Sequence, residues 1–240
     1  MDRRHWCLGA AAALAGCGAL PVRREPRPTI LPPFVDAAGA WQPHVMRRDR
    51  ATTLYRFVER DGRQAVHALA ERSSSGLRCD VDIDPLATPW LSWEWRVERF
   101  PEGASVEVDE LDDSPARVVV TFDGDVDLLG PRDRLFRETV EFFTGTVLPF
   151  ATLMYVWDGQ APVEKAVAYA RTGRVQYLVV ESGAARAGGW LAYRRNVVED
   201  YRRVFGGEPG RIRHVGLLAD SDDLRTRTDA WFANLAFSAA

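Results

Sequence analysis

Apolar and polar residues alternate in short runs along most of the chain, and this two-residue period predicts β-strands. In residues 91–100, LSWEWRVERF, the side chains of Trp93, Trp95 and Val97 fall on one face and polar side chains fall on the other. Residues 116–122, ARVVVTF, repeat the pattern. Further strands are predicted for other apolar runs, at residues 77–83, 151–158, 175–182 and 211–220.

Turn and helix signals separate these runs. Asp61-Gly62 is a typical two-residue hairpin turn inside residues 53–73, and residues 73–76, SSSG, indicate a second turn. Residues 134–146 are compatible with a helix, whereas residues 190–207 change to a helical period and end at two glycines. In the last strand the pattern places four side chains on one face, those of Trp231, Ala233, Leu235 and Phe237.

These elements predict a mostly β fold. About nine strands, one clear helix and no strand–helix–strand alternation indicate an antiparallel β-sandwich or jelly roll with one or two short helices. Residues 41–240 would form this single domain.

The first residues carry the marks of a secretion signal. A basic start, MDRRHW, precedes an apolar stretch that is too short to span a bilayer and ends in LAGC, residues 14–17. This arrangement resembles a bacterial lipoprotein signal, in which residues 1–16 are removed and Cys17 takes the lipid. An ordinary secretory signal with a chance cysteine is the alternative. Residues 17–40 are proline-rich and predict a tether, so we expect a cell-envelope protein, anchored in the outer membrane and facing the periplasm.

The net charge and the number of cysteines exclude some classes of function. The 31 basic and 34 acidic residues leave a net charge of −3, which argues against a nucleic-acid binder, for which a basic excess is expected. Cys7 belongs to the predicted signal and Cys17 to the anchor, so Cys79 has no partner for an internal disulfide. Cys79 alternates with apolar residues, which indicates a buried thiol rather than a reactive nucleophile.

Six blocks, in their order and spacing, resemble one protein family. They are SSSGL, LSWEWRV, DELDDSPARVVVTF, LMYVW, VVESGAARAGGWLAYRRNVVEDYRRVFG and LLADSDDLRTRTDAWFANLAF, and the resemblance covers roughly residues 50–238. The family is the bacterial domain of unknown function 3047. The resemblance implies a β-sandwich of the galactose-binding, carbohydrate-module type, and it implies no activity. The loop at residues 220–226, DSDDLRT, keeps the acids of the family's DTDNT-like loop and lacks its asparagine–threonine pair.

The acidic stretch at residues 109–122, DELDDSPARVVVTF, allows three interpretations. Aspartates followed by Ser114-Pro115 favour a turn, and Arg117 could form an ion pair with them. The third interpretation is a calcium site built from five carboxylates, those of Asp112, Asp113, Asp220, Asp222 and Asp223. Because neither acidic stretch has the glycine and terminal glutamate of a twelve-residue calcium loop, no metal ligand is predicted.

A polar face opposite the tryptophans is the other candidate site. Alternation places Glu94, Arg96 and Arg117 on such a face, and sugar sites combine polar groups of this kind with an aromatic platform. The predicted ligand-binding residues are Glu94, Arg96, Asp113, Arg117, Trp157 and Trp190. The alternative is that the tryptophans belong to the core and that arginine and glutamate form cross-strand pairs.

No catalytic residue and no cofactor are predicted. His44, His67 and His214 lack the spacing of zinc ligands, and no nucleophile elbow or glycine-rich nucleotide motif occurs. The first hypothesis is therefore a non-enzymatic envelope module that binds a saccharide or another polar ligand. The second is a structural or assembly lipoprotein that docks another envelope protein. The third is a carbohydrate-active hydrolase or lyase that uses Glu94 with Asp112 or Asp113.

Overall fold

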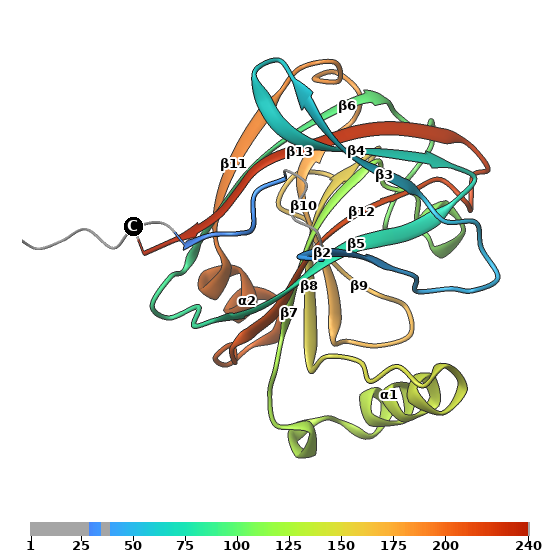
Figure 1. Cartoon of the computed structure of the whole chain (residues 1–240). Helices are drawn as coiled ribbons and strands as arrows, with labels where there is room; N and C mark the ends of the chain where they lie inside the picture. The colour runs from blue at the N-terminus through green and yellow to red at the C-terminus, as the bar shows by residue number, and fades with distance from the viewer. Residues whose placement is uncertain (1–28, 35–38, 240) are drawn as a thin grey trace, which may run out of the picture.

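The structure is a computed structural model that describes residues 29–34 and 39–239, and its strands form two sheets packed face to face (Figure 1). The described residues thus form the mostly β sandwich that the alternation predicts, with two α-helices. The predicted signal, residues 1–16, and Cys17 lie outside the described residues. Within the described part, no helix has the length and hydropathy needed to cross a bilayer.

The six-stranded sheet is antiparallel throughout. In spatial order its strands are β11 (Leu191–Asn196), β6 (Trp90–Arg99), β13 (Arg227–Ser238), β4 (Arg63–Glu71) and β3 (Leu54–Arg60), and β1 (Thr29–Ile30) pairs with β13. Strands β3 and β4 form the hairpin predicted from the sequence. Asp61 and Gly62 at its tip both have positive φ, 51° and 72°, as the twist of a two-residue hairpin requires.

The seven-stranded sheet contains one parallel pair. In spatial order its strands are β2 (Trp41–His44), β5 (Ser74–Ile83), β12 (Ile212–Asp220), β7 (Ala116–Phe122), β8 (Ala151–Asp158), β10 (Val175–Ser182) and β9 (Ala166–Ala168). The parallel pair is β8 with β10, and it departs from the expected antiparallel order. In a simple meander β9 would lie beside β8. Here β10 lies beside β8 and runs parallel to it, and β9 pairs with the other edge of β10 in the antiparallel direction.

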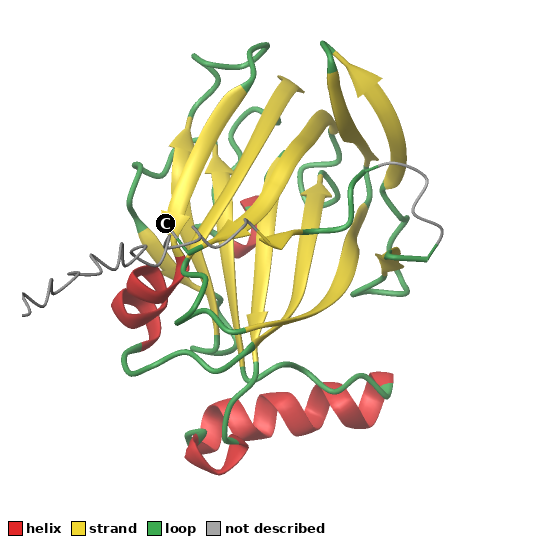
Figure 2. Cartoon of the chain, turned by 60° about the vertical axis from the view of Figure 1, so that its left-hand side comes forward, coloured by secondary structure: helices red, strands yellow, loops and turns green. Residues whose placement is uncertain are grey.

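Two helices lie outside the sheets (Figure 2). Helix α1 (Pro131–Thr144) occupies the stretch whose sequence was only compatible with a helix; it begins with a proline and ends at Gly145, whose φ is 70°. Helix α2 (Val197–Phe205) begins at Asn196, whose side chain accepts hydrogen bonds from the N–H groups of two first-turn residues. Short 3₁₀ turns occur at η1 (Asp109–Leu111) and η2 (Val126–Leu128).

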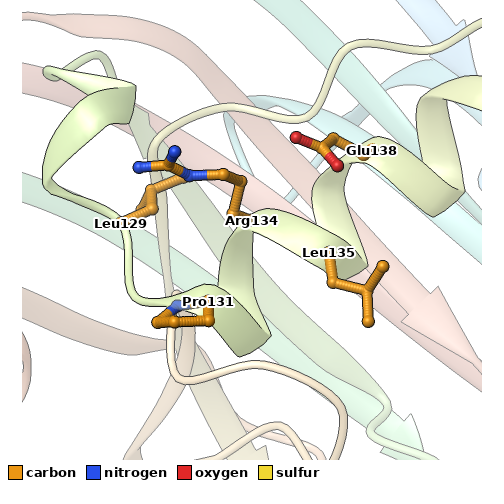
Figure 3. A pocket seen from close by; sticks show the side chains of 5 residues that line it. All are labelled: Leu129, Pro131, Arg134, Leu135 and Glu138. Carbon is orange, nitrogen blue, oxygen red and sulfur yellow. The ribbon is translucent and has the colours of Figure 1, made fainter.

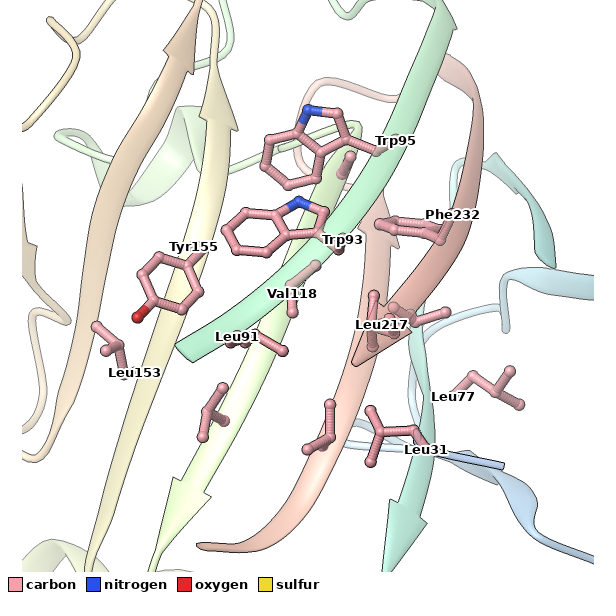
Figure 4. Packing of buried hydrophobic residues seen from close by; sticks show 14 of the residues in the cluster. Leu31, Leu77, Leu91, Trp93, Trp95, Val118, Leu153, Tyr155, Leu217 and Phe232 are labelled. Carbon is pink, nitrogen blue, oxygen red and sulfur yellow. The ribbon is translucent and has the colours of Figure 1, made fainter. Parts of the chain in front are cut away.

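Aromatic side chains dominate the core between the sheets (Figure 4). Trp93 stacks on Tyr155 with ring centroids 5.1 Å apart, and it meets Trp95 edge to face at 5.5 Å. The indole nitrogens of Trp93 and Trp95 are buried and have no hydrogen-bond partner among the described residues. Cys79 is buried in the same cluster, and burial raises the pKa of its thiol, as expected for a packing residue.

Three local predictions are wrong. The helical period expected over residues 190–207 holds only from Val197, because Leu191–Asn196 form strand β11. Residues 73–76 are not a turn, because β5 begins at Ser74; the chain crosses from one sheet to the other at Arg72, which has a φ of 50°. In β13, a bulge beside Asn234 shifts the pairing by one residue. As a result Phe232 and Phe237 both pack in the core, and Trp231 lies on the outer face.

The sandwich includes residues that the sequence placed in the tether. Leu31 and Phe34 are buried in the core, and the Trp41 indole donates to the Pro32 carbonyl at 3.0 Å. Strand β1 adds two residues to the edge of β13. The folded body therefore extends back to residue 29.

Candidate functional site

The structure does not assemble the single polar face expected from the sequence. Glu94 and Arg96 lie on β6 of one sheet, and Arg117 lies on β7 of the other. Their neighbours Trp95 and Val118 point into the core, so the polar side chains lie on opposite outer faces of the sandwich. The prediction is wrong because alternation separates the inside from the outside of a strand and does not say to which sheet the strand belongs.

Arg117 is the centre of a buried ion-pair group at the end of β7. It is 3% exposed, and its Nη2 donates to Oδ1 of Asp112 and of Asp220, both at 3.0 Å. The Tyr177 ring lies beside the guanidinium, and its hydroxyl donates to Asp112 at 2.8 Å. Burial lowers the pKa of Arg117, but the two carboxylates outweigh burial and hold that pKa above its ordinary value. The ion pair considered from the sequence is therefore present, and it leaves Arg117 almost no surface for a ligand.

Asp113 belongs to a second acidic group. Its buried carboxylate accepts two backbone N–H groups from the loop after β12, at 3.2 and 2.8 Å. Oxygens of Asp113, Asp222 and Asp223 lie within 4.8 Å of one another, and Arg50 pairs with Asp222 at 3.2 Å. The five carboxylates considered for calcium thus divide between two groups, one around Arg117 and one beside Arg50.

Glu94, Arg96 and Trp190 come together at the tip of the β3–β4 hairpin. Asp61 at the tip accepts hydrogen bonds from the Trp190 indole at 2.9 Å and from Arg96 at 3.2 Å. Arg63 donates to Glu94 at 2.5 Å, and its guanidinium lies 4.9 Å from the centroid of the Trp190 ring. These five residues are called the hairpin-tip cluster below. They form the cross-strand arginine–glutamate pairing that was the alternative to a site.

Trp157 cannot act as a stacking platform. It is fully buried, its indole donates to the Gly183 carbonyl at 2.8 Å, and its ring packs against Trp95 and Phe100. Trp190 is half-buried and keeps part of its ring exposed. Of the two predicted platforms, only Trp190 is accessible to a ligand.

The carboxyl pair considered for hydrolysis is not assembled. Glu94 lies on the outer face of the six-stranded sheet, and Asp112 and Asp113 lie against the seven-stranded sheet. The aromatic core separates them. Acid–base cleavage of a glycosidic bond requires two carboxyls that face each other across the bond, so this pair does not fit the reaction.

The most unusual surface is one that sequence reasoning missed. Five large apolar side chains on α1 and its flanking loops are exposed, and we call them the α1 apolar surface: Leu128 (77%), Leu135 (65%), Phe142 (83%), Phe143 (78%) and Val147 (58%). Helical spacing was the available signal. Leu135 and Phe142 are seven residues apart, which places them on one side of the helix, whereas the half-buried Phe136 and Val140 lie on another.

A shallow hollow lies next to this surface (Figure 3). Its volume is ≈ 330 Å³, and its lining comes from Leu129, Pro131, Arg134, Leu135 and Glu138. A sugar site normally combines an apolar wall with several convergent polar groups, and this hollow has two charged side chains at its rim.

The comparison with family models bears on the whole sandwich. The model of the family described as protein of unknown function (DUF3047) matches residues 39–236. The chain belongs to this family. No curated protein matches the sequence.

Two solved structures show distant similarity to this DUF3047 member. The xyloglucanase domain of NopAA, a type three effector from Sinorhizobium fredii in complex with cellobiose, is 8% identical with a TM-score of 0.36, covering 82% of this chain and 97% of that one. The family 11 xylanase from Neocallimastix patriciarum is 8% identical with a TM-score of 0.27, covering 82% and 94%. At this level of similarity, neither structure bears on what this chain does.

Proposed function

We propose that this protein is a non-enzymatic assembly protein of the cell envelope, held there by a lipid on Cys17, and that it docks through the α1 apolar surface. The observation that supports docking is the exposure of Phe142 and Phe143, 83% and 78%, on neighbouring positions of one helix. The two rings meet edge to face with centroids 5.2 Å apart. An exposed apolar patch usually marks a contact surface.

The orientation of α1 strengthens this argument. A surface helix normally turns its apolar stripe toward its own domain. Here the attachment combines the half-buried Phe136, whose ring lies 6.3 Å from that of Tyr169, with polar contacts: Asp133 accepts hydrogen bonds from Thr172 and Gly173 at 2.7 and 2.9 Å, and Arg137 donates to the Leu148 carbonyl. Leu135, Phe142 and Phe143 remain exposed. No residue of α1 is buried. Covering a phenylalanine contributes about 1.5–3 kcal/mol, so a partner that buries both rings gains several kcal/mol.

The proposed anchor has a reach suited to docking at a membrane. The chain between Cys17 and Thr29 would span up to roughly 40 Å if extended. Replacing the lipidated residue, Cys17→Ser, is expected to move the protein from the membrane fraction to the soluble fraction. A wild-type protein that is already soluble would remove the anchor from the proposal.

Docking can be tested by site-specific photo-crosslinking in cells that make the protein. A photoreactive phenylalanine analogue at position 142 is compared with the same analogue at Leu86, which is 59% exposed between β5 and β6. We expect a protein adduct of defined mass at position 142 only. Equal adducts at both positions, or none at position 142, would contradict docking through α1.

Binding of a polar ligand at the hairpin-tip cluster is the second candidate function. The cluster unites Glu94, Arg96 and Trp190, and its arginines can donate paired hydrogen bonds to hydroxyl or carboxylate groups. The test is thermal unfolding of residues 29–240 with neutral and acidic oligosaccharides. A stabilisation lost in Trp190→Ala and kept in Trp90→Ala supports the site, since Trp90 lies at the far end of β6. If no oligosaccharide raises the melting temperature, this candidate fails.

A further inference from the structure

The exposed side of α1 has residues at the spacing found where one helix packs against another. Pro131, Leu135, Thr139 and Phe142 follow one another at spacings of three or four residues, so they form a continuous stripe. The opposite side of the helix, around Asp133 and Arg137, contacts the sandwich. Figure 2 shows α1 lying across one end of the sandwich, so its outer side is not covered by the described strands or loops.

We infer that this stripe pairs with the same stripe of a second copy of the chain, the two α1 helices running antiparallel. The inference rests on the proposed function and names the docking partner as a second copy. Such an interface is isologous, because each copy presents the same patch and receives the same patch. A two-fold axis near Glu138 and Thr139 places Leu135 of each copy opposite Phe142 of the other.

The hollow beside α1 has the geometry of a receiving site in this pair. Four of its lining residues, Pro131, Arg134, Leu135 and Glu138, stand at positions i, i+3, i+4 and i+7. Four residues at this spacing form the hole into which a side chain of a facing helix inserts. In the antiparallel arrangement the side chain at that point is Phe142 of the second copy, the most exposed large apolar residue described. The two-fold axis makes the insertion reciprocal.

The charges beside the stripe favour an antiparallel second copy. Arg134 and Glu141 are seven residues apart and therefore lie on the same flank of α1. Their order opposes the helix dipole, since the basic residue is near the N-terminus, and the last turn has no basic residue. Antiparallel pairing brings Arg134 of each copy next to Glu141 of the other, which pairs opposite charges twice. In a parallel pair the two Arg134–Glu141 flanks would lie on opposite sides of the interface, so these charges would not pair.

The exposed apolar area around α1 sets the expected affinity of the dimer. With about 150–250 Å² for a whole aromatic side chain, the α1 apolar surface offers roughly 500 Å² per copy, compared with about 800 Å² per partner in a standard interface. The helix pair therefore supplies the centre of an interface of moderate size. We expect dissociation constants on the order of micromolar, because area of this extent only modestly exceeds the cost of association.

Sedimentation equilibrium of residues 29–240, which contain every strand and helix of Figure 1, tests the pair. We expect a reversible dimer for the wild type and for the control Leu86→Glu, and a monomer for Phe142→Glu. Circular dichroism checks that each variant is folded. A wild type that stays monomeric at several hundred micromolar would overturn the inference, as would equal loss of dimer in both variants.

A charge exchange tests the antiparallel direction. Arg134→Glu and Glu141→Arg each improve the match to the helix dipole, so neither should unfold α1, yet each should weaken the dimer tenfold or more. The double variant restores opposite charges across the pair and should recover most of the wild-type affinity. A double variant as weak as the single variants contradicts the antiparallel arrangement.

The crosslinking experiment separates this inference from the proposed function. An adduct at position 142 with twice the mass of the chain supports self-pairing. An adduct of another mass, with a monomeric wild type in sedimentation, overturns self-pairing and leaves docking to a different protein. A monomer with no adduct overturns both.

Discussion

Replacing Arg117 by methionine, Arg117→Met, is expected to remove a large part of the stability of the sandwich. The arginine is 3% exposed, and its Nη2 makes three contacts of 2.9–3.0 Å with Asp112 and Asp220. Methionine keeps the apolar length of the side chain and removes the charge. Two carboxylates then remain buried without their cation, which is the costly way to break a buried ion pair.

The structure sets the size of the effect. Loss of one partner from a buried pair costs about 3–5 kcal/mol. Each acid keeps one other hydrogen bond, because Tyr177 donates to Asp112 at 2.8 Å and the Ser114 N–H donates to Asp220 at 2.7 Å. We therefore expect the lower end of the range, about 3 kcal/mol near neutral pH.

The loss should depend on pH in a defined direction. Burial raises the pKa of Asp112 and Asp220 even with Arg117 present, so the folded state holds protons more tightly than the unfolded state. Without the arginine the folded-state pKa of these acids rises further. Protonation then neutralises the buried acids, so the stability deficit shrinks as pH falls toward the ordinary carboxyl pKa and is largest above the raised values.

Urea unfolding followed by tryptophan fluorescence measures both effects, at about pH 8 and about pH 5. The matched control is Arg213→Met, because Arg213 is 44% exposed and pairs with Asp82 and Asp123 at 2.7 Å. An exposed pair of this kind contributes about 0–1 kcal/mol. A deficit below 1 kcal/mol for Arg117→Met, or one equal at both pH values, would refute the reasoning.

Three further outcomes are expected. Asn196→Ala should lower the unfolding free energy by about 1 kcal/mol, because it removes the side chain that caps the N-terminus of α2. Asn196→Asp retains a capping oxygen and should keep most of this free energy. Equal losses for the two variants in urea unfolding would argue against capping. Cys79 in residues 29–240 should react with a thiol reagent only as fast as the protein unfolds, since burial raises its pKa; rapid native labelling contradicts this. Burial, and after it the charge of Arg78, lowers the pKa of His44 below 6.5, so the unfolded state binds the proton better. The unfolding free energy should therefore fall from about pH 7 to pH 5. His44→Gln should make this dependence on pH shallower, and an unchanged dependence would contradict the role of His44.

Much of the fold could be predicted from local patterns. The alternation of Trp93, Trp95 and Val97 identified the buried face of β6, and the Asp61-Gly62 pair identified the hairpin. Both signals are local, because side-chain direction alternates within a strand and a two-residue turn needs positive φ. The glycines that end the helices act through the same local backbone preference.

The bulge in β13 shows where local patterns stop. A strict two-residue period would place Trp231 and Phe237 on one face, yet the extra residue at Asn234 places them on opposite faces. Nothing local requires that bulge. It occurs because β13 must keep its pairing with β6 from Asp229 to Ser238 while both ends pack against the same core.

By itself, the sequence determined the class of the fold, the buried face of regular strands such as β6, and the Asp61-Gly62 hairpin. Only the tertiary structure decided which surface side chains lie next to one another. It separated Glu94 from Arg117 by the thickness of the core and joined Glu94 to Trp190 through the hairpin tip. It also turned Phe142 away from the sandwich. The physical reason is that burial is a property of a residue and its near neighbours, whereas a surface forms from strands and helices that are distant in the chain.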